Sequence, residues 1–285
     1  MRAGATRRDL LALLGAAALA GAASARPLDD VVQSGVLRVA LYRENAPFSD
    51  NSDKGPVGID VDLAKRIAAE IGVKAEIRIV EASENVDGDF RLNLWRGDLA
   101  GTGLADLMLS VPADKKLEIR NEQVFFTPPY ARQQLSIAYR KGTVEGGFQD
   151  LQDIEGRTIA LEGTSPADAL IALANGGVFR DSAKHFRTFD EAAEDFVAGR
   201  SDFLGGSRSA IENAVWKAMA VDVEIKDLAG TGLIRPQWEL CGAVRSDSRD
   251  LGYRVGEAIA AIAARGETKA IFAAHGASFA PPSGY

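Results

Sequence analysis

The chain has 285 residues, of which 46% are hydrophobic and 26% charged, a composition that is typical of folded proteins and excludes a disordered chain. Its length suffices for one large domain or two small ones. The 33 Lys and Arg residues against 40 Asp and Glu residues give a net charge of −7, and because an acidic surface repels phosphate we expect no nucleic-acid partner. The two histidines lie far apart and Cys241 is the only cysteine, so we expect no metal site, disulfide framework or cofactor.

The first 25 residues have the pattern of an export signal. Three arginines precede an apolar run at 10–22, which is too short to span a bilayer and is followed by the small-residue triplet Ala-Ser-Ala at 23–25. The pair Arg7-Arg8 is also typical of a twin-arginine signal, so the export route stays open between that pathway and the general one. Since no cysteine comes directly after the signal and no later segment is long and apolar enough to cross a membrane, we expect a soluble periplasmic protein without a lipid anchor.

Strand and helix patterns alternate along the rest of the chain. Short apolar or alternating segments predict strands at 36–41, 74–80, 105–109, 135–139, 157–161, 202–204, 223–227 and 241–245. Helical spacing and capping residues predict helices at 61–71, at 166–175, from the capping box at Thr188 to Gly199, and from Leu251 to the stop at Gly266. This alternation predicts an α/β fold of parallel-rich sheets covered by helices.

Several short motifs follow one another in an order that resembles a known family. They are Ala46-Pro47-Phe48 with Gly-Ile-Asp-Val-Asp-Leu-Ala at 58–64, Ala-Asp-Leu-Met-Leu-Ser at 105–110, Val-Phe-Phe-Thr-Pro-Pro-Tyr at 124–130, Asp-Ile-Glu-Gly-Arg-Thr-Ile-Ala at 153–160 and Glu-Gly-Thr-Ser at 162–165. In this order they resemble the periplasmic solute-binding proteins of polar amino-acid importers, family 3, which have the two-lobed type II fold.

The resemblance implies two lobes joined by a two-strand hinge. Lobe 1 would comprise residues 28–132 plus 241–278 and lobe 2 residues 142–234, with the hinge crossings at 133–141 and 235–240. A small-molecule ligand would bind between the lobes, at the carboxyl ends of the strands, and the lobes would close around it. The resemblance also implies a monomer that delivers its ligand to a membrane ABC permease.

An amino-acid site in such a cleft needs a cation for the carboxylate, an anion for the ammonium group and an aromatic wall. Phe48 and Tyr130 are candidates for the wall, although both are equally suited to the core. Gly163, Thr164 and Ser165 precede a helix, where their backbone N–H groups and hydroxyls form an anion site or the residues simply cap the helix.

Two further positions argue against a common amino acid as the ligand. Arg120 falls near the clamp arginine of the family, but the residues before it differ, so it is either the clamp or a solvated helix residue. Ser207 stands where the family has an amine-binding aspartate, and a hydroxyl cannot replace a carboxylate that faces a desolvated ammonium group. With Ser110 from the central strand motif, these residues complete the predicted binding set, and we expect a small polar or anionic solute.

A narrower resemblance points to a different partner. Residues 87–97, 105–114 and 120–124, with the segment 129–133, resemble the binding-protein-like J protein found with PQQ-dependent methanol dehydrogenases and related quinoprotein dehydrogenases. Members of that branch are thought to assist or activate the dehydrogenase. The resemblance therefore implies an accessory protein of a periplasmic quinoprotein dehydrogenase as an alternative to an importer's binding protein.

A third possibility is an enzyme on the same scaffold, such as a periplasmic cyclohexadienyl dehydratase. Acid–base catalysis needs a poised carboxyl or imidazole group in the cleft. Glu44 and Glu162 are possible cleft carboxylates, but nothing in the sequence pairs them, and His185 and His275 lie away from the cleft motifs. We therefore expect a non-catalytic protein without catalytic residues.

Overall fold

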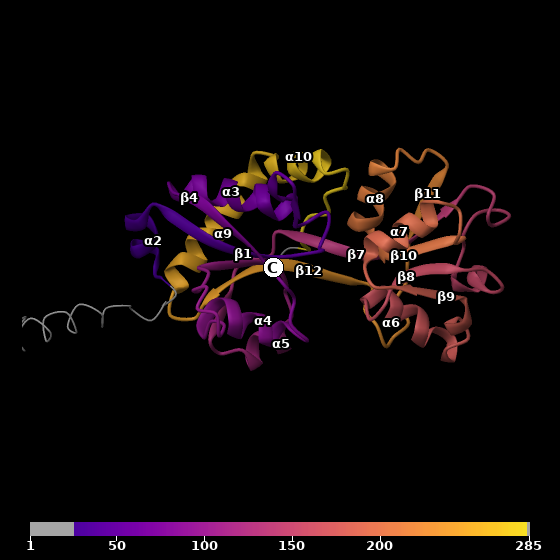
Figure 1. The fold of residues 1–285 in the computed structure, drawn as a ribbon, viewed down its shortest axis with the longest axis horizontal. Helices are drawn as coiled ribbons and strands as arrows, with labels where there is room; N and C mark the ends of the chain where they lie inside the picture. Colours follow the sequence, from indigo (N-terminus) through magenta and orange to yellow (C-terminus); the bar gives the residue numbers. More distant parts are fainter. Residues whose placement is uncertain (1–25, 284–285) are drawn as a thin grey trace, which may run out of the picture.

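The computed structural model describes residues 26–283, which form two lobes connected by long strands (Figure 1). The predicted export signal at 1–25 lies outside the described residues. Each lobe has three parallel strands, in the order β4-β1-β5 in lobe 1 and β10-β8-β9 in lobe 2. The predicted α/β class with two helix-covered, parallel-rich lobes is confirmed.

Lobe 1 is formed by the first half of the chain and its C-terminal helices. Its elements are α2 (Leu28–Ser34), β1 (Val36–Tyr42), β2 (Asp50–Ser52), β3 (Gly55–Val57), α3 (Ile59–Ile71), β4 (Lys74–Val80), α4 (Val86–Phe90), the π-helix η1 (Arg91–Trp95), β5 (Leu107–Pro112), α5 (Lys115–Arg120), β6 (Val124–Phe126), α9 (Arg249–Ala264) and α10 (Glu267–Ala274). Alternate side chains of β1 point to opposite faces of the sheet: Leu37 and Val39 pack under α3 and α9, and Ala40 packs with Phe90 and Leu94.

Lobe 2 repeats this layered arrangement. Its elements are η2 (Leu151–Ile154), β8 (Ile159–Glu162), α6 (Pro166–Leu173), η3 (Ala174–Gly176), η4 (Arg180–Ser182), β9 (Ala183–Phe186), α7 (Phe189–Val197), β10 (Phe203–Ser207), α8 (Arg208–Lys217) and β11 (Val223–Asp227). Ile159 and Leu161 pack on the side of α6, whereas Ala160 packs with Phe196 and Ile211 from α7 and α8.

Two long strands, β7 (Ala131–Arg140) and β12 (Gln237–Arg245), run between the lobes (Figure 1). β7 pairs with β10 and β11 in lobe 2, while β12 pairs with β5 and β6 in lobe 1. The two strands pair with each other in between, over residues 131–134 and 237–240. One sheet path therefore continues through both lobes, and the cleft is bounded on one side by this pair of strands.

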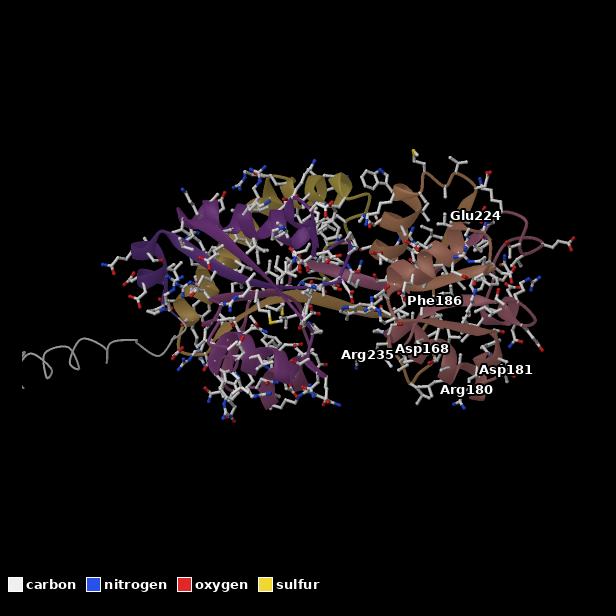
Figure 2. The ribbon with its side chains drawn as sticks, viewed as in Figure 1. Asp168, Arg180, Asp181, Phe186, Glu224 and Arg235 are labelled. Atoms are coloured by element: carbon white, nitrogen blue, oxygen red, sulfur yellow. The ribbon has the colours of Figure 1, made fainter. Side chains whose placement is uncertain are left out.

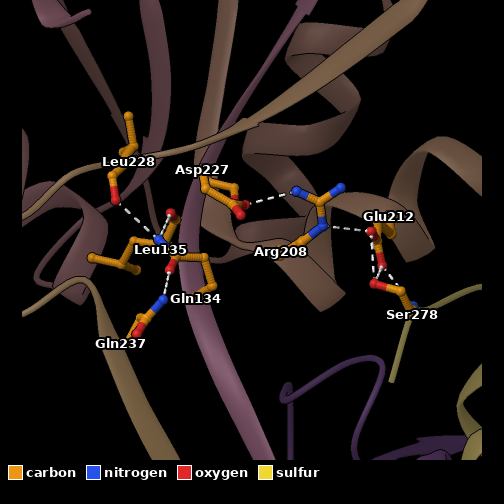
Figure 3. Close-up of polar contacts among 9 residues, drawn as sticks. Gln134, Leu135, Arg208, Glu212, Asp227, Leu228, Gln237 and Ser278 are labelled. Carbon is orange, nitrogen blue, oxygen red and sulfur yellow. Dashed lines mark hydrogen bonds and ion pairs between the residues drawn. The ribbon is translucent and has the colours of Figure 1, made fainter. Parts of the chain in front are cut away.

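The lobes also touch at the end of the chain. The Asn213 side-chain amide donates to the His275 carbonyl at 2.7 Å, and Ser278 donates from its N–H and hydroxyl to the Glu212 carboxylate (Figure 3). Arg208 in turn bridges Glu212 and Asp227. These contacts connect α8 of lobe 2 to the segment that follows α10 of lobe 1.

Most predicted elements are present at their expected positions, while others begin or end a few residues away. The strand predicted at 105–109 runs from 107 to 112, and α3 begins at Ile59, after Gly58, instead of at residue 61. Several elements were not predicted, among them α2, α8, β6, β9 and α10. Within residues 26–283, no helix has the length and apolar character needed to cross a membrane. The predicted lobe and hinge boundaries stay predictions.

Candidate functional site

Two adjoining cavities, of about 700 and 170 Å³, lie between the lobes. Their linings share residues from lobe 1, from lobe 2 and from the connecting strand β12. The shared residues are Glu44, Asn45, Ala46, Glu162, Pro166, Ser207 and Trp238. This interlobe cleft lies where open α/β sheets place their ligands, at the carboxyl ends of parallel strands.

A buried carboxyl group organises the lobe 1 side of the cleft. Asp60, with no exposed surface, accepts hydrogen bonds from the Tyr130 hydroxyl at 2.9 Å and the Ser110 hydroxyl at 2.6 Å. Ser110 accepts a bond from the Asn45 amide at 3.2 Å, and its own N–H donates to the Tyr130 oxygen at 3.1 Å. Burial raises the pKa of Asp60 to about 7, although the two hydroxyl bonds work to lower it. A chain of hydrogen bonds therefore connects a titratable core carboxyl group to the cleft surface.

The aromatic wall differs in part from the predicted one. Phe48 lines the larger cavity and packs edge-on against Phe272, with ring centroids 5.9 Å apart. Tyr130 is buried behind the surface, with its hydroxyl committed to Asp60, and it lines neither cavity. Trp238 lines both cavities. Sequence analysis missed Trp238, because only the register of β12 brings this residue to the cleft.

The predicted anion site at Gly163, Thr164 and Ser165 is already occupied by groups of lobe 2 itself. The Gly163 N–H donates to the Phe186 carbonyl at 2.9 Å, and the Ser165 N–H donates to the Glu162 carbonyl at 3.3 Å. The Thr164 N–H donates to the carboxylate of Asp168 at 2.9 Å.

Asp168 therefore holds the place that a solute carboxylate would take. It lies in the first turn of α6, where a negative side chain is favoured by the helix dipole, and it also contacts the His185 ring at 2.9 Å. Figure 2 labels Asp168 and Phe186 in this part of lobe 2. Of the predicted anion-site residues, Thr164 lines the larger cavity and Ser165 lines the smaller one.

The structure does not bring Arg120 to the cleft. Its guanidinium group donates to both carboxylate oxygens of Asp87, at 3.0 and 2.9 Å, and Arg120 lines neither cavity. The Asn121 amide also donates to Asp87, and these hydrogen bonds hold the pKa of Asp87 below its usual range. Arg120 is thus a partly exposed residue that joins α5 to α4, which is the alternative that the sequence left open.

Ser207, at the end of β10, lines both cavities. Its hydroxyl accepts from the Ala210 N–H at 3.3 Å and so caps α8. The two glycines before it allow the close packing of this strand: a Cβ atom at Gly206 would lie 2.4 Å from the Phe189 ring. No carboxylate replaces the family's amine-binding aspartate at this position.

Carboxylates nevertheless dominate the cleft. Those that line the larger cavity are Glu44, Glu81, Glu84, Asp89 and Glu162. Among the described residues of that lining, Arg43 is the one basic side chain, and it pairs with Glu81 at 3.0 Å. At the rim, Arg187 of lobe 2 reaches across to Glu44 of lobe 1, with N–O distances of 3.1 and 3.2 Å.

Glu162 is the carboxyl group whose environment most resembles that of a functional acid. It is half-buried at the end of β8, and burial raises its pKa, as do the nearby charges of Glu44 and Asp190. A carboxyl group in such a position can pair with a bound cation, which would lower its pKa again, or can donate its proton to a substrate. Within residues 26–283, no three His, Cys, Asp or Glu side chains are grouped to hold a metal ion.

Comparisons with known proteins place this cleft in context. Residues 37–91 match the model of the bacterial extracellular solute-binding proteins, family 3. The chain is 34% identical over 146 residues to the cyclohexadienyl dehydratase of Pseudomonas aeruginosa, covering 51% of this chain and 48% of that protein. It is 30% identical over 149 residues to membrane-bound lytic murein transglycosylase F 1 of Alkalilimnicola ehrlichii, covering 52% and 27%.

The prediction that the chain is not an enzyme is contradicted by these relatives, because both are enzymes that align with this scaffold. The chain matches about half the length of the dehydratase and about a quarter of the transglycosylase. The association with a quinoprotein dehydrogenase stays a prediction.

Solved structures resemble the chain over most of its length. An ancestral cationic amino acid solute-binding protein superimposes with a TM-score of 0.68 at 22% identity, covering 87% of this chain and 99% of that one. An amino acid ABC transporter substrate-binding protein from Streptococcus pneumoniae, bound to L-arginine, gives a TM-score of 0.63 at 23% identity, covering 91% and 100%. The chain therefore has the two-lobed type II fold of periplasmic binding proteins and, in its first lobe, the sequence signature of the family 3 solute-binding proteins.

Proposed function

We propose that the protein is a periplasmic solute-binding protein whose interlobe cleft takes up a small cationic solute for an ABC importer. The observation that carries this proposal is the acidic lining of the larger cavity, which has five carboxylates. Glu81 pairs with Arg43 and Glu44 with Arg187, while Glu84 and Glu162 form no ion pair among residues 26–283. Clefts lined by one sign of charge concentrate ligands of the opposite sign. The two similar structures, a cationic amino acid solute-binding protein and a substrate-binding protein bound to L-arginine, support the same ligand class.

An anionic solute, which the sequence had suggested, fits this cleft poorly. The N–H groups of Gly163, Thr164 and Ser165 are bonded within lobe 2, and Arg120 is bound to Asp87 outside the cleft. A carboxylate or phosphate would have to displace the Asp168 side chain while facing the charges of Glu44 and Glu162. An amine or guanidinium group would instead meet the carboxylates of Glu44 in lobe 1 and Glu162 in lobe 2.

Calorimetric titration tests the proposal with L-arginine, agmatine, L-lysine and putrescine against L-glutamate and L-aspartate. We expect at least one of the four cations to bind and neither anion to do so. Glu162→Gln should weaken cation binding by about tenfold or more, since it removes a charge that is partly shielded from water. Glu155→Gln, which removes an exposed carboxylate of the same lobe away from the cleft, is the matched control and should bind as the wild type does.

The pH dependence of binding provides a second readout of the same site. Because a bound cation favours the charged form of Glu162, and the pKa of that group is raised in the empty protein, affinity should increase as pH rises through the raised pKa. Glu162→Gln should remove this dependence. Binding that is tightest for an anion, or that shows no response to Glu162→Gln, would exclude the proposed ligand class.

A dehydratase activity is the second candidate, supported by the raised pKa of Glu162 and by the relative of that name. A carboxyl group whose pKa is raised by burial is suited to protonate a departing hydroxyl group, as general acid catalysis requires. The test is turnover of prephenate or arogenate by the wild type, Glu162→Gln and Glu155→Gln. Turnover that is lost only in Glu162→Gln would establish the enzyme, and absence of turnover with either substrate would exclude this candidate.

The role as accessory to a quinoprotein dehydrogenase is an alternative that would use a surface outside the cleft. Asp87, from the segment 87–97, binds Arg120 and Asn121 from the segment 120–124, so two of the motifs of that branch are in contact outside the cleft. Native mass spectrometry of protein isolated gently from the periplasm tests it. A retained dehydrogenase subunit would support the accessory role, and a retained small solute would support the binding protein.

A further inference from the structure

The strand pair that bounds the cleft contains a buried hydrogen-bond acceptor without a partner. Gln133 on β7 is 3% exposed, and among residues 26–283 nothing donates to its side-chain oxygen. Its side-chain nitrogen donates to the Arg132 carbonyl at 3.3 Å, which identifies the oxygen as the open end of the amide. Buried polar atoms are nearly always paired, so an orphan of this kind indicates a function or a missing partner.

The position of Gln133 connects this orphan to the cleft. Gln133 lines the larger cavity, and in the β7–β12 ladder it lies opposite Trp238, which lines both cavities. Directly opposed residues of antiparallel strands project on the same face, with Cβ atoms about 5 Å apart. The acceptor and the indole ring are therefore neighbours on the same side of the cleft.

From this arrangement we infer that Gln133 and Trp238 form a subsite for an N–H-bearing cationic group, a protonated amine or guanidinium. An indole face attracts cations, and an amide oxygen accepts their N–H bonds. The surrounding carboxylates add charge, whereas the subsite adds a requirement for a hydrogen-bond donor. The inference rests on the proposed function and specifies which part of the cleft recognises the nitrogen end of the solute.

Both residues lie on the strands that connect the lobes. The Gln133 oxygen is covered in the conformation described here, and a rotation of one lobe against the other changes what covers side chains on these strands. The solute nitrogen takes the place of the missing donor when the lobes close on it. The bound solute thus supplies the hydrogen-bond donor that the Gln133 oxygen lacks.

The test uses Gln133→Met, which keeps the size of the side chain and removes the acceptor. For each of L-arginine, agmatine, L-lysine and putrescine that binds the wild type, we expect affinity to fall by about tenfold or more in calorimetric titration. The melting temperature of the ligand-free variant should stay unchanged or increase, because an unpaired buried acceptor has been removed. If Met is not accommodated, Gln133→Leu removes the same oxygen with a smaller side chain.

Gln134→Met is the matched control from the adjacent position. The Gln134 side chain donates to the carbonyls of Leu135 and Leu228 at 2.6 and 3.0 Å and accepts from Gln237 at 2.6 Å, and it lines neither cavity (Figure 3). This variant should lose stability and keep its affinity, the reverse of the pattern expected for Gln133→Met.

The outcomes separate this inference from the function on which it rests. If a cation binds the wild type and Gln133→Met equally, the subsite is wrong and the cation-binding function stands. If none of the four cations binds the wild type, both the subsite and the cation-binding function are wrong. A loss of affinity in Gln133→Met that Gln134→Met does not share supports both.

Discussion

Asp60 in lobe 1 and Asp195 in lobe 2 are both buried aspartates, and their carboxyl groups are held in opposite ways. Asp60 in lobe 1 is surrounded by the hydroxyl groups of Tyr130 and Ser110, and burial raises its pKa to about 7. Burial also works to raise the pKa of Asp195 in lobe 2, but Lys184, Ser201 and Arg200 outweigh it and hold that pKa at about 2. No lysine or arginine of residues 26–283 forms an ion pair with Asp60, whereas two do so with Asp195.

The difference follows the position of the two groups relative to the cleft. Asp60 contacts Ser110, a residue of the cleft lining, whereas neither Asp195 nor its three partners line the cavities. A buried carboxylate that pairs with lysine and arginine contributes to stability. A buried carboxyl group that has only hydroxyl partners and a pKa near neutral is found more often at functional sites. The comparison thus distinguishes a structural carboxylate from one that supports the binding surface.

The largest effect expected is on the pH dependence of stability. Because the pKa of Asp60 is raised by folding, the folded state holds this proton more tightly, and its contribution to stability is lost as pH rises from about 4 to about 7. The limiting slope is about 1.4 kcal/mol per pH unit. Asp60→Asn should remove this slope. The free energy of unfolding of the variant, measured in urea, should therefore increase relative to that of the wild type between pH 5 and 8. Parallel curves for the two proteins would show that Asp60 does not titrate in this range.

A smaller effect is expected for Asp195→Ala. The carboxylate is 2% exposed and receives Lys184 at 2.6 Å and Arg200 at 2.9 Å, but both cations are partly solvated. We expect a loss of about 2–3 kcal/mol at pH 7, below the cost of breaking a fully buried pair. In the wild type this contribution should be lost as pH falls below about 4, the opposite sign from Asp60. Asp181→Ala, an exposed aspartate of the same lobe, should leave the urea midpoint unchanged.

The fold and the cleft were predictable from sequence to different depths. The alternation of strands and helices is local, so the α/β class and most elements follow from the pattern of single segments. Asp60 and Tyr130 are 70 residues apart, and nothing local indicates that the tyrosine hydroxyl would bind the carboxyl group instead of facing a ligand. Gln133 and Trp238 reach the cleft only through strand register, which the sequence does not give.

At the predicted anion site, the competing group is already visible in the sequence. Asp168 stands four residues after Thr164 in the first turn of a predicted helix, and a carboxylate there competes for the same N–H groups as a ligand. Its position four residues after Thr164 therefore argues against an anion site there. For Arg120, by contrast, the partner Asp87 is 33 residues away in the sequence. Only the structure therefore shows that Arg120 lies outside the cleft.

The smallest effect on stability is expected at the rim of the cleft, where Arg187 of lobe 2 pairs with Glu44 of lobe 1. Both side chains are exposed, so Arg187→Gln should leave the urea midpoint nearly unchanged. The pair nevertheless joins the lobes directly, and its loss should shift ligand-free protein toward more open conformations, measured as a larger radius of gyration in small-angle X-ray scattering. In 0.5 M NaCl, where exposed charges are screened, wild type and variant should converge. An identical radius of gyration at low salt would show that the strands and the contacts of α8, and not this ion pair, set the distance between the lobes.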